Sequence, residues 1–169
     1  MAATVIAPQP AETLDELHLH RLLVPVDGSQ TAELALEAAV TAARRDRGAI
    51  TLLAVVPDVL AAARRWATLQ VGVPNPARVQ EEADTDAQRR LRDTIRRIPE
   101  DIPVNTIVRH GKPGPEIVAE LDEHDYDAVM LGARGLGRVA AFIGSVSSYV
   151  LHHAAEPVFV AHAPSHSHI

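Results

Sequence analysis

The stretch that decides the fold is RLLVPVDGSQTAELALEAAVTAARRDRGAITLLAVVPD, residues 21–58. Its two ends, 21–27 and 49–58, are short apolar runs of the kind that buried parallel strands form. Between them, apolar residues recur at helical spacing and predict an amphipathic helix that stops at Gly48. The stretch is therefore predicted to be a strand–helix–strand unit, in which a right-handed crossover joins two parallel strands.

The same alternation continues along the chain. Further strands are predicted at 102–111, 126–132 and 156–164, and helices at 79–98, 114–124 and 145–154. A long connection at 58–78 has room for one more short helix. Five strands that alternate with helices indicate one parallel sheet covered on both faces. Residues 20–164 are expected to form a single domain, with flexible tails at 1–19 and 165–169.

Composition excludes several classes of protein. The chain has 169 residues and no cysteine, which excludes disulfides and thiol catalysis. A net charge of −6 without a strongly basic tract argues against a nucleic-acid-binding protein. The N-terminus lacks the pattern of a signal peptide, and no apolar run is long enough to cross a membrane. We therefore expect a cytoplasmic protein that contacts neither nucleic acid nor membrane.

Glycines gather in MLGARGLGRVAAFIGSVSSYV, residues 130–150. Three of them follow a predicted strand, and Gly144 directly precedes a predicted helix. Bare backbone amides and an open helix N-terminus can together bind a phosphate group, with hydroxyls from Ser145 and Ser147 and positive charge from Arg134. A tight turn followed by a helix cap explains the same residues equally well.

Two segments of the chain resemble the universal stress protein family. They are LLVPVDGSQTAELALEAA and the run from VMLGARGLG to GSVSSYVLHHAAEPVFVAH, and the resemblance covers about residues 20–164. It implies a three-layer α/β/α fold (adenine nucleotide alpha hydrolase-like) with a five-stranded parallel sheet in the order 3-2-1-4-5. It also implies ATP as ligand, with Mg²⁺ on the phosphates. Eight residues rather than the family's nine separate Gly135 from Gly144, so AMP or cyclic AMP is an alternative ligand.

The resemblance also assigns the residues of a binding site. Asp27 matches the acid that binds the ribose hydroxyls, and a helix cap is the alternative role for it. Residues implied to line the cleft or contact adenine are Pro25, Val26, Val55 and Leu131; ordinary core packing explains the three aliphatic ones as well. The phosphate motif falls on Gly132, Gly135, Gly144 and Ser145, with Val146, Ser147 and Arg134 beside it. Valine at Gly132 or Gly144 is expected to abolish binding with little loss of fold.

The function that follows is that of a stress-related regulator or sensor that binds an adenine nucleotide. A slow ATP-hydrolysing enzyme of the same fold is one alternative, since no catalytic residue stands out. A nucleotide-free interaction module is another. The apolar last strand predicts an edge that pairs with a second copy, and the family resemblance implies a homodimer through Pro157 to His162. Nine histidines show no ligand spacing typical of a metal site, so none is expected.

Overall fold

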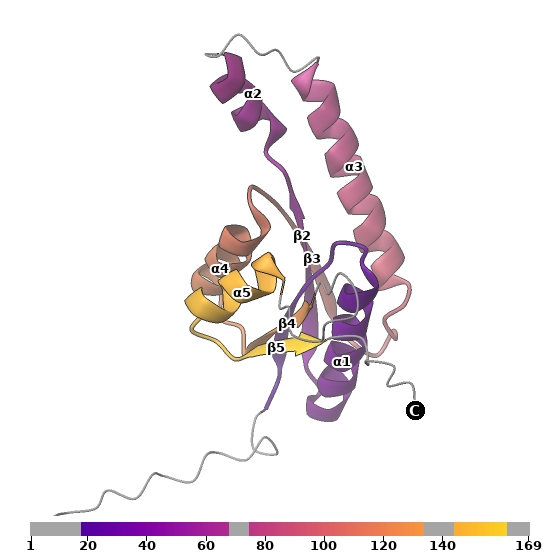
Figure 1. Cartoon of the computed structure of the whole chain (residues 1–169). Helices are drawn as coiled ribbons and strands as arrows, with labels where there is room; N and C mark the ends of the chain where they lie inside the picture. Colours follow the sequence, from indigo (N-terminus) through magenta and orange to yellow (C-terminus); the bar gives the residue numbers. More distant parts are fainter. Residues whose placement is uncertain (1–17, 68–74, 134–143, 162–169) are drawn as a thin grey trace, which may run out of the picture.

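A computed structural model describes residues 18–67, 75–133 and 144–161 of the chain, and these form a five-stranded parallel sheet between helices (Figure 1). The strand order is β3-β2-β1-β4-β5, as the family resemblance implies. The strands are β1 (Arg21–Pro25), β2 (Ala49–Val56), β3 (Val104–His110), β4 (Ala128–Gly132) and β5 (Val158–Ala161). Because β1 and β4 are neighbours at the centre, their carboxyl ends lie side by side.

The helices cover both faces of the sheet. They are α1 (Gln30–Asp46), α2 (Val59–Ala67), α3 (Pro76–Ile95), α4 (Pro113–Glu123) and α5 (Ser145–His153). On one face, α1 and α3 pack on side chains such as Leu22 and Val24; on the other, α4 and α5 pack on Leu23. Successive residues of a strand point to opposite faces, so a continuously apolar strand such as β1 serves two cores at once.

An arm extends beyond the sheet (Figure 1). It consists of α2 and the first half of α3, which lie against each other above the ends of β2 and β3. The short helix allowed for at 58–78 is therefore present as α2. None of the helices in the described ranges has both the length and the apolar character that crossing a membrane requires.

Two details differ from the sequence-based expectations. Helix α3 begins at Pro76, ahead of the predicted start at Val79, because Asn75 caps it by accepting a hydrogen bond from the Arg78 amide at 3.3 Å. It ends at Ile95, whose side chain is 38% exposed rather than part of the core stripe. At the other end of the domain, Leu19 is buried and its amide donates to Asp46, although the sequence places it in the N-terminal tail. The tail residues 1–17 and 165–169 lie outside the described residues.

Candidate functional site

A cavity of about 640 Å³ lies at the carboxyl ends of the central strands. Its walls come from the end of β1 and the start of α1, from β2, from the start of α4, and from β4 and the start of α5. Ten residues assigned to the site from the sequence line it: Pro25, Val26, Asp27, Val55, Leu131, Gly132, Gly144, Ser145, Val146 and Ser147. The other two, Arg134 and Gly135, lie outside the described residues.

Seven further residues of the cavity wall were not assigned from the sequence. Ser29, Gln30 and Thr31 belong to the first turn of α1, and a neighbouring wall residue, Ala32, is buried beneath them. The remaining wall residues are Leu53 of β2 with Pro113 and Ile117 of α4. A helix start after β1 was visible in the sequence, but nothing in the pattern shows which helix faces turn toward the cavity.

Asp27 lies on the cavity wall in the loop between β1 and α1. Its Oδ1 accepts a hydrogen bond from the Ser29 amide at 2.9 Å. The N-cap of α1 is Ser29, whose Oγ accepts from the Ala32 amide at 3.2 Å. The alternative role of Asp27, as the cap of this helix, is therefore taken by Ser29, and the Asp27 carboxylate is exposed at the cavity.

Three helices, α1, α4 and α5, begin at the cavity, and each directs its N-terminal backbone toward that end of the sheet. Helix α5 is capped by Gly144, which supplies no side-chain hydrogen bond, so Ser145 is not the cap and lies exposed in the first turn. Ser147 is buried, and its hydroxyl donates to the Gly132 carbonyl at 3.1 Å. A helix N-terminus carries partial positive charge, so three of them at one cavity favour a negatively charged ligand.

Gly132 lacks a side chain because of packing within the protein, whereas contact with a ligand was expected from the sequence. A Cβ atom there would lie 2.5 Å from the Ala32 nitrogen and 2.7 Å from the Thr31 oxygen, and would also contact the Thr31 carbonyl carbon. The end of β4 therefore touches the backbone of the first turn of α1. The expectation that valine at Gly132 leaves the fold intact is wrong, because the side chain has no space even without a ligand.

Another part of the cavity wall is apolar. Leu53, Ile117 and Leu131 line it and are nearly inaccessible to water, while Val55 is partly exposed. Val26 is also buried. These side chains belong to the core and also form the cavity wall, so they can pack in the core and contact a ligand at the same time. A flat apolar group such as a nucleobase suits this end of the cavity.

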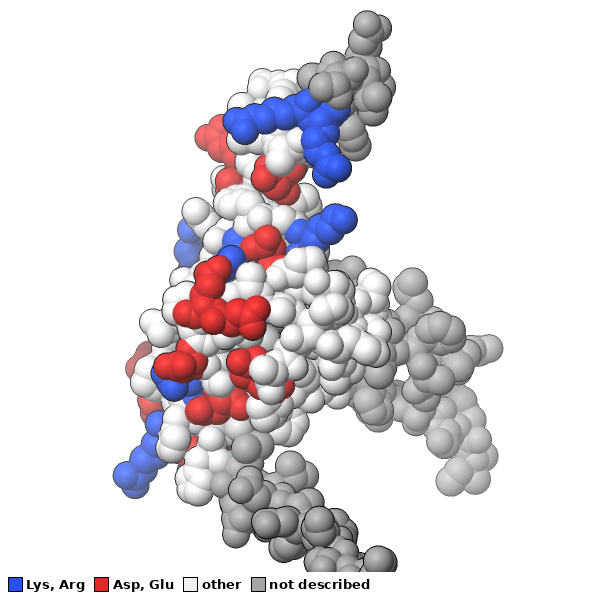
Figure 2. Space-filling view, turned by 90° about the vertical axis from the view of Figure 1, so that its left-hand side faces the viewer, with Lys and Arg blue, Asp and Glu red and all other residues white. Residues whose placement is uncertain are grey.

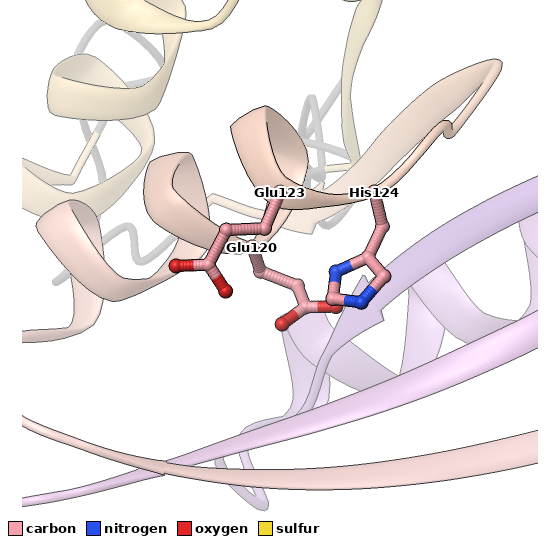
Figure 3. Close-up of side chains that lie close together, drawn as sticks. All are labelled: Glu120, Glu123 and His124. Atoms are coloured by element: carbon pink, nitrogen blue, oxygen red, sulfur yellow. The ribbon is translucent and has the colours of Figure 1, made fainter.

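A second cavity, of about 860 Å³, lies at the opposite end of the sheet, at the amino ends of β1 and β2 and beside the end of α4. Acidic side chains gather on this side of the molecule (Figure 2). Glu120, Glu123 and His124 project from the end of α4 with ligand atoms within 4.8 Å of one another (Figure 3). Their spacing on one helix turn resembles a metal site, and therefore their other contacts decide what they do.

Arg109 of β3 already supplies a cation to this cluster. Its guanidinium donates to Glu116 at 2.9 Å, to Glu120 at 3.0 Å and to Glu123 at 2.8 Å. The other oxygen of the buried Glu120 accepts from the Tyr126 hydroxyl at 2.9 Å. Both Glu120 oxygens are thus engaged, and a metal ion would meet the positive charge of Arg109. The cluster is a structural link between β3 and α4.

The pKa values in this cluster follow from the same contacts. Hydrogen bonds from Arg109 hold the pKa of Glu123 below its ordinary value, and hydrogen bonds to Glu123 and Glu116 raise the pKa of Arg109. Burial, together with the hydrogen bond to Glu120, raises the pKa of Tyr126 to about 12. The phenol therefore remains a hydrogen-bond donor throughout the physiological range.

Comparisons with known proteins agree with this architecture. A model described as "Universal stress protein family" matches residues 18–162. Universal stress protein Sll1388 from Synechocystis is 29% identical over 140 residues, covering 79% of this chain and 91% of the relative. Universal stress protein Rv2005c from Mycobacterium tuberculosis is 34% identical over 145 residues, covering 83% of this chain. The matched region spans only 44% of that mycobacterial relative.

Solved structures show the same fold. The universal stress protein UspA from Lactobacillus plantarum superposes with a TM-score of 0.70 at 26% identity, over 85% of this chain and 98% of that one. A universal stress protein in complex with cAMP gives 0.55 at 18% identity, with coverage of 87% and 99%. One from Archaeoglobus fulgidus in complex with dAMP gives 0.60 at 21% identity, with coverage of 86% and 98%.

Proposed function

Because the chain belongs to the universal stress protein family, we propose that it is an adenine-nucleotide-binding member that holds its ligand in the cavity of about 640 Å³. The observation that carries the proposal is that ten residues which the family resemblance assigned to the site line that one cavity. Two structural neighbours in complex with cAMP and dAMP support an adenine nucleotide as the ligand.

In this proposal each part of the cavity binds one part of the nucleotide. The apolar end beside Val55 and Leu131 takes the adenine, and the Asp27 carboxylate accepts hydrogen bonds from the ribose hydroxyls. The open amides of Gly144 and Ser145 at the start of α5 donate to phosphate oxygens. ATP, AMP and cyclic AMP share these three chemical groups, and Mg²⁺ would accompany the phosphates of ATP.

The biological role proposed is that of a cytoplasmic regulator or sensor in a stress response, acting as a homodimer. Asp27 is the one acidic or basic side chain among the described wall residues, and the family resemblance assigns it to the ribose rather than to the phosphates. Hydrolysis of ATP at this site is accordingly expected to be slow. Measuring product from ATP with Mg²⁺, beside an Asp27→Ala variant, tests this: a rapid, Asp27-dependent turnover would favour an enzyme.

Calorimetric titration of ATP, AMP and cyclic AMP into the full chain tests the binding itself. Asp27→Ala is expected to weaken all three by about tenfold or more, the usual value of hydrogen bonds to a charged group. Asp122→Ala is the matched control, because Asp122 is an exposed acid beside the second cavity, at the opposite end of the sheet. No binding of any nucleotide at millimolar levels would reject the proposal and favour a nucleotide-free interaction module. Mass spectrometry of copurified small molecules identifies the bound nucleotide.

A further inference from the structure

The described walls of the nucleotide cavity carry one charged side chain, that of Asp27, and its charge is negative. A nucleotide brings further negative charge to the same place. Opposite charges within hydrogen-bonding distance are the usual means of binding phosphate in proteins, and helix N-termini supply only partial charges. A cation close to the rim of the cavity, outside its described wall, would therefore strengthen the binding of a nucleotide.

Arg90 of α3 lies at that rim. Its Cδ atom is 3.4 Å from the position that a Cβ atom of Gly28 would occupy. Gly28 stands between Asp27 and Ser29, which both line the cavity, and it has a φ of +79°, a conformation that favours glycine. The methylene groups of Arg90 thus pack against the loop that carries Asp27, while the charged end is exposed to water.

Two other arginines of this helix, and Arg96 at its C-cap, have acidic partners. Arg89 pairs with Asp86 at 2.9 Å and Arg96 with Asp93 at 3.3 Å. Arg78 pairs with Glu82 at 2.8 Å. Within the described ranges, Arg90 and Arg92 are the arginines of α3 with no ion pair or hydrogen bond. Of these two, Arg90 lies against a loop of the cavity, and its guanidinium is available to a ligand.

We propose that Arg90 is a phosphate-binding residue of this site and makes it prefer nucleotides to nucleosides. The inference rests on the proposed nucleotide binding and adds a residue to it. A guanidinium presents a planar set of N–H donors that fits two phosphate oxygens at once, which a lysine ammonium does not reproduce. Because Arg90 belongs to α3, its guanidinium binds the phosphates from the face of the sheet opposite α4 and α5.

Arg90→Ala tests the proposal, with Arg92→Ala as the matched control. The two residues lie on the same helix, are both exposed and carry the same charge, but Arg92 lacks the contact with the Gly28 loop. Calorimetric affinities for ATP, AMP and adenosine are compared for each variant at low and high salt. Arg90→Ala is expected to weaken ATP and AMP by about tenfold or more and adenosine by less than twofold. Arg90→Lys should recover part of the loss.

The outcomes separate this inference from the proposed function. If the wild-type chain binds ATP, and the Arg90→Ala variant has the same affinity as the Arg92→Ala variant for every ligand, then Arg90 does not bind phosphate. The proposed nucleotide site is unaffected by that result. An equal loss for adenosine and ATP also rejects the inference, since it means that Arg90 supports the loop rather than the phosphates. If the wild-type chain binds no nucleotide, both proposals fail together. Thermal melting of the variants checks that the fold is retained.

Discussion

Gly132 shows, at the scale of one residue, how packing and binding can require the same residue type. The residue ends β4 in the cavity wall, but its lack of a side chain is what allows the backbone of Thr31 and Ala32 to approach. The approach brings the start of α1 against β4, and so sets two walls of the cavity relative to each other. A glycine in a binding motif is therefore not evidence that a ligand touches it.

We predict that Gly132→Ala destabilises the protein in the absence of any ligand. The added Cβ would overlap backbone atoms of α1, and overpacking of this kind costs about 1–3 kcal/mol. Urea unfolding measures the loss. Ser145→Ala is the control, because Ser145 is exposed in the first turn of α5 and does not cap that helix. An unchanged unfolding midpoint for Gly132→Ala would show that the helix shifts freely.

Glu120 is a second residue whose surroundings decide how a substitution changes the stability of the protein. It is only 1% exposed, and Arg109 compensates its charge. We predict that Arg109→Met costs about 3 kcal/mol in free energy of unfolding, because it leaves a buried carboxylate without its cation. Adding Glu120→Gln to the same variant should restore much of that loss, since a neutral amide needs no cation. A double variant as unstable as the single one would contradict this explanation.

The pH dependence of stability follows from Glu123 in the same cluster. Its pKa is depressed in the folded state by hydrogen bonds from Arg109. A depressed carboxyl pKa stabilises the fold above the ordinary value for glutamate, and that contribution disappears as the pH falls through the depressed value. We expect the loss of stability on acidification to be shallower in Arg109→Met than in the wild type. Denaturant unfolding between neutral and acidic pH measures the difference.

At the scale of elements, the arm depends on contacts between its two helices. Helix α2 has nine residues, too few for stability on its own in water. The buried Gln80 of α3 accepts a hydrogen bond from the Val59 amide at 2.8 Å and donates to Asp84 at 3.1 Å. Asp84 in turn lies 2.8 Å from the His110 ring at the end of β3. Gln80 therefore joins α2, α3 and the sheet.

We predict that Gln80→Leu loosens α2 without unfolding the domain. The Val59 amide would lose its shorter hydrogen bond and keep only the one to the Pro57 carbonyl at 3.0 Å, and the loss of one hydrogen bond costs about 0.5–1.5 kcal/mol. Hydrogen exchange of residues 59–67 should accelerate by about tenfold, while exchange in α1 stays unchanged. Gln88→Leu, at an exposed position of α3, is the control. Equal exchange in both variants would mean that apolar contacts alone hold the arm.

Acid should loosen the same contact. Burial raises the pKa of Asp84, but the hydrogen bonds from His110 and Gln80 outweigh it, so the pKa lies below the ordinary value. The contribution of Asp84 to arm stability is thus present above the ordinary pKa of aspartate and disappears as the pH falls through the depressed one. The pair is partly exposed, which keeps the effect small.

For the whole molecule, the sequence predicted the elements better than the surfaces between them. In the described part of the chain, apolar runs and helical spacing identified every strand and four of the five helices in order, because each buries a continuous face; α2 was allowed for only as a short helix within a long connection. The order of the strands came from the family resemblance. Pro113 and Ile117 were missed as wall residues, since their part in the cavity depends on how α4 packs on the sheet. The contact of Gly132 with α1 was missed for the same reason: sequence spacing does not show which backbone segments touch.

The proposed homodimer concerns the molecule as a whole, and β5 is its most direct test. This strand is at the sheet edge, and its described residues are all partly buried. The carbonyls of Pro157 and Ala161 accept hydrogen bonds from Val129 at 3.0 Å and Ala133 at 2.7 Å, both on the β4 side. Backbone groups of successive residues point to opposite sides of a strand, so the Val160 amide points to the free edge. His162 lies outside the described residues.

We therefore predict that Val160→Pro converts a dimer into a monomer while leaving the β4–β5 ladder intact. Proline removes one outward donor, and it is tolerated on the open side of an edge strand. Sedimentation velocity measures the mass, and Val160→Ile is the control because it keeps the donor and the shape. Far-ultraviolet circular dichroism checks that the sheet persists. If the proline variant stays folded and dimeric, the two copies associate through another surface, and the β5 edge must be protected in some other way.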